Sequence, residues 1–226
     1  QECINYLIDS DIVVTNPPFS KFTELFSLIT KYDKQYLLIS NQNAITYKEI
    51  FPYIKNNKAR VGYHFGDMAF RVPDDTEPRK TRFWVDEFGQ KWRSLGNAMW
   101  LTNLEVSNDS GKKLVLTHSF KEENYPKYDN FDAVHVYRVS EIPMDYYGIM
   151  GVPLTYLKYH NDKMFEIVGE ANHGSDNEYD LFKPQINGKE TFKRILIQRR
   201  KRDKRMEFRI LDLFCGAGGM SVPIFH

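Results

Sequence analysis

The stretch Asp11-Ile12-Val13-Val14-Thr15-Asn16-Pro17-Pro18-Phe19 decides the fold class of this chain. Ile12 to Thr15 is a short, mostly β-branched run, which predicts a buried strand. The strand must end at Asn16, because two successive prolines cannot donate hydrogen bonds to a β-ladder. A strand that stops at a stiff proline turn is typical of a sheet that binds a ligand at the carboxyl ends of its strands.

Helices and strands alternate on both sides of this stretch. Residues 2–9 are a candidate helix, and Ser20 is a candidate N-cap for a second helix that reaches about Tyr32. Residues 36–40 and 60–65 are candidate strands, and residues 47–57 are a candidate helix that Pro52 must kink unless it lies near the start. The order predicts an α/β layer with buried parallel strands, and its small size suggests half of a Rossmann-like sheet.

The composition and hydrophobic pattern of the sequence change at about residue 66. Short strand-like runs there alternate with charged, Gly- and Pro-containing stretches, and residues 86–91 are a candidate hairpin turn. The strand candidates are residues 82–85, 98–106, 114–117, 133–138 and 191–198. Three regions follow: residues 1–70 as half of a catalytic sheet, residues 71–198 as a β-rich target-recognition region, and residues 199–226, which begin with a basic run of linker character.

The composition excludes several classes of protein. The net charge of the 226 residues is only +1, so any contact with nucleic acid must come from a local patch. Two cysteines far apart, Cys3 and Cys215, and six histidines without ligand spacing predict neither a metal site nor a disulfide framework. The cysteine usage predicts a reduced, cytoplasmic setting, and without an evident long apolar run or signal peptide we expect no membrane partner.

The turn at Asn16 has the right groups to hold a base. Stiff prolines can aim the Asn16 side-chain oxygen and the Pro17 carbonyl at one point, and two converging acceptors suit an exocyclic amino group. Phe19 offers a flat face for a ring. The alternative is that Asn16, Pro17 and Pro18 form a turn after a strand and nothing more.

These residues resemble the EcoRI-type adenine-specific DNA methyltransferases. The resemblance runs from about residue 2 to 200 and includes residues 11–19, 82–85, 100–104 and 146–153. It implies methyl transfer from S-adenosylmethionine to N6 of an adenine flipped out of double-stranded DNA, within a bacterial restriction–modification system. Asn16, Pro17 and Phe19 would then bind the base, and Pro18 would shape the turn.

One departure from the family concerns the cofactor. Its glycine-rich loop should precede the Asn-Pro-Pro-Phe motif, but the 15 residues before Asn16 contain no such loop. A strand and glycine turn instead follow at residues 208–219, where Asp212, Phe214, Gly216 and Gly218 are the candidate cofactor residues. This segment resembles the start of a cytosine-5 DNA methyltransferase, without its Pro-Cys nucleophile. Either a second methyltransferase begins near Met206, or the loop serves the adenine site in a permuted order.

The region after residue 66 supplies weaker candidates. Lys80, Arg82, Lys91 and Arg93 are candidate DNA contacts, although a solvated surface is the alternative for each. Two other functions remain open. An Asn-Pro-Pro-aromatic motif also serves RNA and protein methyltransferases, and a fragment without a cofactor loop could bind DNA without catalysis.

Overall fold

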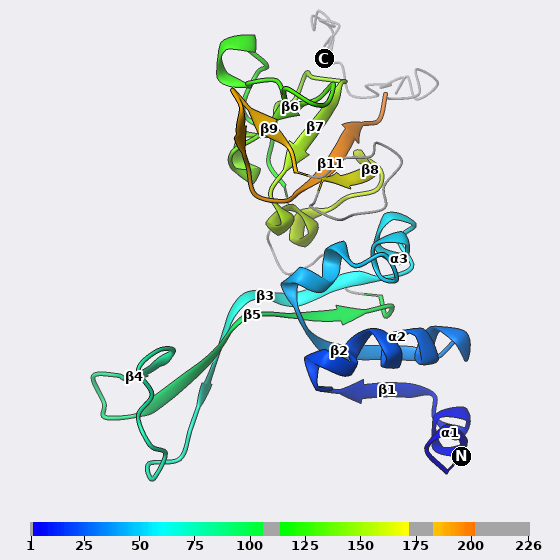
Figure 1. Ribbon diagram of the computed structural model, residues 1–226, viewed down its shortest axis with the longest axis vertical. Coiled ribbons are helices and arrows are strands. Elements are labelled where there is room, and N and C mark those ends of the chain that lie inside the picture. Colours follow the sequence, from blue (N-terminus) through cyan, green and yellow to red (C-terminus); the bar gives the residue numbers. More distant parts are fainter. Residues whose placement is uncertain (1, 106–113, 172–182, 202–226) are drawn as a thin grey trace, which may run out of the picture.

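The computed structural model describes residues 2–105, 114–171 and 183–201, which form two larger sheets, a two-stranded hairpin and several short helices (Figure 1). No helix among these residues is long and apolar enough to cross a membrane. The first sheet has the strand order β1-β2-β5-β3, and the second has the order β6-β7-β11-β8.

The first sheet contains the predicted strands, but one of its neighbours was not foreseen. β1 (Ile12–Thr15) runs parallel to β2 (Gln35–Asn41). The next strand along the chain, β3 (Arg60–Arg71), does not pair with β2. β5 (Lys91–Thr102) lies between them and is antiparallel to both. The predicted α/β class is confirmed, but parallel pairing is confirmed only for β1 and β2, because a later segment is inserted between β2 and β3.

Short helices connect these strands. They are α1 (Glu2–Asp9), η1 (Phe19–Lys21), α2 (Phe22–Lys31), η2 (Gln42–Thr46) and α3 (Phe51–Lys55). The predicted cap at Ser20 is wrong, because Ser20 lies inside η1 and α2 starts without a side-chain cap. Pro52 lies in the first turn of α3, where its missing N–H costs no helical hydrogen bond.

Aromatic packing fixes α2 on one face of the first sheet. Phe22, Phe26 and Ile29 are buried on the helix, and Tyr36 and Leu38 are buried on β2. The Phe26 and Tyr36 rings meet edge to face with centroids 5.6 Å apart. Such a contact adds about 1 kcal/mol to the area that each ring buries.

The other side of β1 is open among the described residues. Val13 packs on the core, whereas Ile12 and Val14 point to the opposite face and are exposed, Val14 by 65%. β1 pairs with β2 alone within the described part of the chain, so its outer edge carries free backbone groups.

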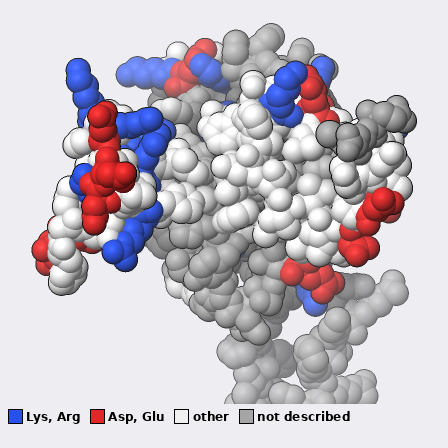
Figure 2. All heavy atoms as spheres, turned by 90° about the horizontal axis from the view of Figure 1, so that it is seen from below, with Lys and Arg blue, Asp and Glu red and all other residues white. Residues whose placement is uncertain are grey.

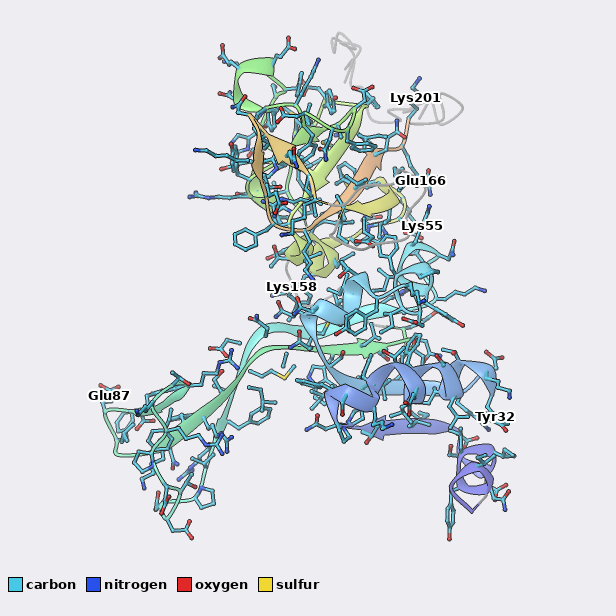
Figure 3. All side chains as sticks on the ribbon, viewed as in Figure 1. Tyr32, Lys55, Glu87, Lys158, Glu166 and Lys201 are labelled. Atoms are coloured by element: carbon cyan, nitrogen blue, oxygen red, sulfur yellow. The ribbon has the colours of Figure 1, made fainter. Side chains whose placement is uncertain are left out.

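β3 and β5 continue past the first sheet as a ribbon. Ala98 is the β5 partner of Asn41, the last residue of β2, so β5 residues 91–97 extend beyond β2. There they pair with β3 and with β4 (Phe83–Val85). We call residues 67–97 the arm; Figure 1 shows it projecting from the sheet, and Figure 3 shows Glu87 at its far end.

The second sheet consists of β6 (Val134–His135), β7 (Ile149–Val152), β8 (Phe165–Ala171) and β11 (Arg194–Arg199). A small hairpin, β9 (Gln185–Ile186) and β10 (Lys189–Glu190), precedes β11. The remaining turns are η3 (Glu122–Asn124), η4 (Val139–Glu141) and η5 (Leu154–Tyr159). One hydrophobic cluster contains buried residues of both sheets, such as Leu38 and Ile197, so the two sheets share a core.

Candidate active site

The Asn16–Pro18 turn lies at the carboxyl end of β1. A residue before proline is restricted to extended conformations, and both Asn16 and Pro17 precede one. Pro18 is itself extended, with φ −55° and ψ 130°. Pro17 is buried and anchors the turn, whereas Asn16 is exposed. Three successive restricted residues leave the Asn16 side chain on a stiff support.

The helix that follows holds the turn in place. The Lys21 backbone N–H donates to the Pro18 carbonyl across 2.9 Å, which closes η1 and starts the chain toward α2. Phe22, the first residue of α2, is buried, whereas Phe19 remains 48% exposed beside Asn16. The structure therefore presents an amide and an aromatic ring to solvent on the same turn.

The Asn16 carboxamide differs from the amides at the end of the neighbouring strand. The Asn41 side chain accepts a hydrogen bond from the Asn43 backbone N–H at 2.9 Å, and Gln42 donates to the Ala98 carbonyl at 3.3 Å. Both of those amides stabilise the fold. The Asn16 side chain has no hydrogen bond to any described residue, so its oxygen and nitrogen are available to a ligand.

The four predicted DNA contacts all lie on the arm, but two of them have structural partners. Lys91 donates to the backbone carbonyls of Asp74 and Thr76, the latter at 3.0 Å. Arg82 reaches across Gly96 and donates to the Leu95 carbonyl at 3.3 Å.

The Lys80 and Arg93 side chains make no hydrogen bond or ion pair with any described residue. Of the four predicted DNA contacts, these two therefore have charges that remain available. Figure 2 shows charged side chains of both signs gathered on the arm, beside a central face that carries few charged side chains in that view.

A polar and aromatic scaffold stiffens the arm. The Trp84 and Trp92 rings are parallel to within 8°, with centroids 6.4 Å apart. The Trp92 indole donates to Asp86 Oδ2 at 2.8 Å, and Asp86 Oδ1 accepts from the backbone of Phe88 and Gln90. These bonds, the Trp92 bond first, lower the pKa of Asp86 below its usual range. The predicted turn at residues 86–91 is confirmed, and its rigidity comes from Asp86.

The described residues include the candidate base-binding turn but none of the predicted cofactor residues. The carboxyl ends of β1 and β2 carry proline and amide residues. The candidate cofactor residues Asp212, Phe214, Gly216 and Gly218 lie outside the described residues. Within the described ranges, no group of three or more His, Cys, Asp or Glu side chains could hold a metal.

One contact that the sequence did not predict joins the connection before β11 to the segment that follows β2 in the first sheet. Lys193 donates to Thr46 Oγ1 at 3.3 Å, and Thr46 belongs to η2, which starts directly after β2. The hairpin before Lys193 had a local signal, since Asn187-Gly188 is the dipeptide preferred in two-residue hairpin loops. Both residues have the positive φ that this turn requires, 51° and 72°. The long-range contact had no such signal.

Comparison with known proteins gives consistent matches. A family model described as the adenine-specific methyltransferase EcoRI matches residues 1–211. The Type II methyltransferase M.EcoRI of Escherichia coli is 45% identical over 207 residues, which are 90% of this chain and 62% of that protein. M.MgeORF184P of Mycoplasma genitalium is 38% identical over 174 residues, 74% of this chain and 54% of the relative. The chain thus spans less than two thirds of these relatives, and no solved structure matches it.

Proposed function

Because the chain belongs to the EcoRI-type family of adenine-specific methyltransferases, we propose that the full-length protein methylates N6 of adenine at a specific DNA site. The relatives are Type II methyltransferases by name, so a role in a restriction–modification system is part of the proposal. The observation that carries it is the exposed Asn16 carboxamide, held without an internal partner on a proline turn at the carboxyl end of β1.

The chemistry requires an acceptor of this kind. The N6 lone pair of adenine is conjugated into the ring and is a poor nucleophile. When the Asn16 oxygen and the Pro17 carbonyl accept its two hydrogens, the nitrogen is favoured in a more tetrahedral form, and its lone pair becomes available to a methyl donor. A rigid turn matters because orientation supplies much of the rate enhancement.

The substrate is an extruded base in this proposal. Neither Asn16 nor Phe19 could reach N6 inside an intact stack, so the adenine must leave the duplex first. The exposed Phe19 ring then supplies a face on which the flipped base stacks.

S-adenosylmethionine is the methyl donor that the family implies. The candidate cofactor residues lie outside the described residues, so in this proposal its cradle is formed by other parts of the full-length protein. The free edge of β1 and the exposed Ile12 and Val14 are where such a part could extend the sheet. We expect the full-length protein to act in the cytoplasm, together with its DNA substrate.

The shape of the arm favours DNA over a small molecule as the substrate. A β-ribbon fits the major groove of B-DNA, and this one leaves the sheet at the same edge that carries Asn16. Lys80 and Arg93 would contact phosphates or bases from it, while Lys91 and Arg82 help to hold its shape.

The test is to incubate the full-length protein with S-adenosylmethionine and unmethylated DNA, and to identify the product nucleoside by mass spectrometry. We expect N6-methyladenine in DNA, with little methylation of RNA or protein. Asn16→Ala should lower kcat by about 100-fold or more, the usual cost of removing one well-placed hydrogen-bonding group.

Asn43→Ala is the matched control. Asn43 is also exposed and lies at the same edge, at the end of the neighbouring strand. It should retain activity, and Asn16→Ala should retain DNA affinity. Methylation of RNA in preference to DNA, or full activity of Asn16→Ala, would overturn the proposal.

A further inference from the structure

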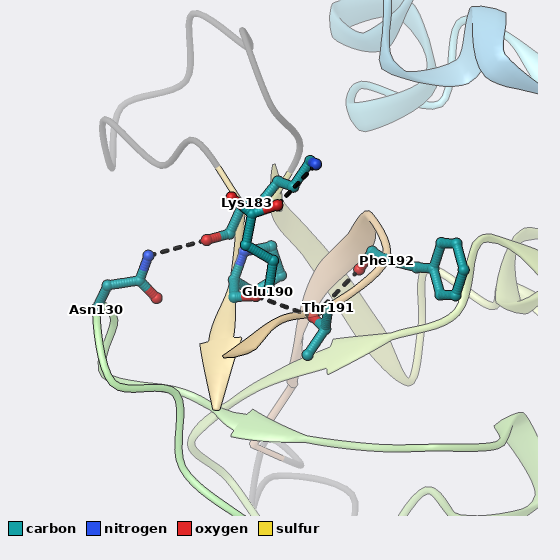
Figure 4. A network of polar contacts seen from close by, with 6 residues as sticks. Asn130, Lys183, Glu190, Thr191 and Phe192 are labelled. Atoms are coloured by element: carbon teal, nitrogen blue, oxygen red, sulfur yellow. Dashed lines mark hydrogen bonds and ion pairs between the residues drawn. The ribbon is translucent and has the colours of Figure 1, made fainter. Parts of the chain in front are cut away.

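Phe192 is the most exposed aromatic residue among those described, with 87% of its surface open. It lies in the connection between β10 and β11, and Figure 4 shows its ring pointing away from the hairpin. A large apolar side chain that is almost fully solvated contributes nothing to the core. A single exposed aromatic residue is common on a protein surface, so the case for a partner rests on how this ring is held and what lies around it.

The backbone that carries Phe192 is held on both sides. Thr191 donates its N–H to the Pro184 carbonyl at 2.8 Å, and its hydroxyl donates to the same carbonyl at 3.1 Å. On the other side, Lys193 is tied to Thr46 at 3.3 Å. The ring is thus presented by a fixed support and not by a loose loop.

The hairpin below this connection is fixed as well. The Asn130 side chain donates to the Lys183 carbonyl at 2.9 Å (Figure 4) and accepts from the Gln185 backbone at 3.1 Å. The Gly188 N–H donates to Asp129 at 2.7 Å. These bonds join the hairpin to the loop that precedes β6, so the hairpin is attached to the rest of the protein at both of its ends.

The position and charge of this segment suit DNA. Through Lys193 and Thr46 the connection borders η2, at the same strand-end edge as the Asn16 turn. The segment is rich in cations, with one acidic residue, Glu190, which is already paired with Lys183 at 2.8 Å. The cations of residues 183–194 are Lys183, Lys189, Lys193 and Arg194.

We propose that Phe192 is a wedge that enters the DNA base stack and stabilises the duplex from which the target adenine has been extruded. This inference rests on the proposed function, because only a flipped base leaves a gap to fill. Apolar side chains inserted between base steps unstack them and offset part of the cost of deforming the duplex. Lys189, which is exposed, holds a flanking phosphate while the ring enters, and Lys193 keeps the connection attached to Thr46.

The experiment compares methylation of two duplexes by the full-length protein, after the modified adenine has been mapped in DNA methylated by the wild type. In one duplex the target adenine is paired; in the other it faces a mismatched base, which lowers the cost of extrusion. Phe192→Ala should slow methylation of the paired duplex by about tenfold, the effect of losing one aromatic–base stack. On the mismatched duplex it should approach the wild-type rate.

Two variants sharpen the comparison. Phe192→Leu keeps an apolar wedge and should recover much of the rate on the paired duplex. Phe88→Ala is the matched control, because Phe88 is 85% exposed but lies at the turn of the arm, between Glu87 and Gly89. Its ratio of rates on the two duplexes should equal that of the wild type.

The possible outcomes distinguish a failure of the wedge from a failure of the proposed function. A wild-type protein that methylates adenine, with Phe192→Ala unchanged or equally slow on both duplexes, would overturn the wedge and leave the proposed function standing. A wild type without adenine methylation would remove the proposed function and the wedge together.

Discussion

Nδ1 of His135 lies 2.8 Å from the phenol oxygen of Tyr128, inside the second sheet. Arg194 approaches the other ring nitrogen at 3.4 Å, and the Tyr128 hydroxyl donates to the Gly151 carbonyl at 3.4 Å. One assignment of hydrogens satisfies all three contacts: Arg194 donates to Nε2, Nδ1–H donates to Tyr128, and Tyr128 donates to Gly151. It requires a neutral imidazole.

The stability of the protein should therefore fall in mild acid. Burial, and then the charge of Arg194, lower the pKa of His135 from 6.5 to about 4. The unfolded chain takes up a proton below pH 6.5 while the folded chain does not, so folding is penalised progressively between pH 6.5 and about 4. The loss at pH 4.5 should be about 2 to 3 kcal/mol for this group.

Denaturant unfolding at pH 7 and pH 4.5 measures that loss. His135→Gln should reduce the difference between the two pH values, even if its stability at pH 7 is lower. His160 also has its pKa lowered to about 4 by burial, so part of the difference will remain. An unchanged pH dependence in His135→Gln would contradict the assignment.

Gly151 should be intolerant of any side chain. A Cβ at this position would collide with the Tyr128 phenol and displace it from His135. Gly151→Ala should lower the free energy of unfolding by about 1 to 3 kcal/mol, as overpacked sites do. Combining it with Tyr128→Phe, which removes the nearest atom, should restore part of the loss in a thermal unfolding measurement.

The arm cations should differ in their effect on DNA binding. Lys80→Ala and Arg93→Ala should each reduce the slope of log affinity against log salt concentration by about 1, as expected for one lost phosphate contact. Lys91→Ala should leave the slope unchanged, because its ammonium group already binds the carbonyls of Asp74 and Thr76. Titrations of one duplex at several salt concentrations test this, and equal slopes for all three variants would contradict it.

Phe19 should contribute to methylation by stacking its aromatic ring on the base, and not by filling space. Phe19→Ala should lower kcat/KM for DNA by roughly tenfold, the cost of one base–aromatic stack, whereas Phe19→Tyr should keep most of the activity. Because Phe19 is half exposed, the melting temperature of both variants should stay close to that of the wild type. Similar losses in the two variants would argue against stacking.

The order of the arm should also depend on the ionised form of Asp86. The hydrogen bond from Trp92 and the backbone bonds lower its pKa, so this contribution is complete above the ordinary pKa of an aspartate and is lost as the pH falls through the lowered value. The near-ultraviolet circular dichroism of the stacked Trp84 and Trp92 should report the change. In Asp86→Ala the signal should be weak at every pH.

The sequence by itself determined the elements whose cause is local. The β-branched run before Asn16, the restriction that Pro17 and Pro18 impose, and the helical spacing from Phe22 to Ile29 act within a few residues. They predicted the positions of β1, the turn and α2 correctly, and with them the location of the candidate base-binding residues. The expectation that β1 is buried is wrong for the described residues, because Ile12 and Val14 are exposed. The hairpin at Asp86 was predictable for the same reason.

Only the tertiary structure decided which distant segments meet. β5 entered the first sheet between β2 and β3 because its buried face matches theirs, a fit that its own sequence pattern does not reveal. The same holds for charge: Lys91 and Lys80 look alike in the sequence, but only Lys91 finds backbone carbonyls to bind. A long-range hydrogen bond also joins Lys193 to Thr46, and it places the neighbouring Phe192 near η2, which follows β2.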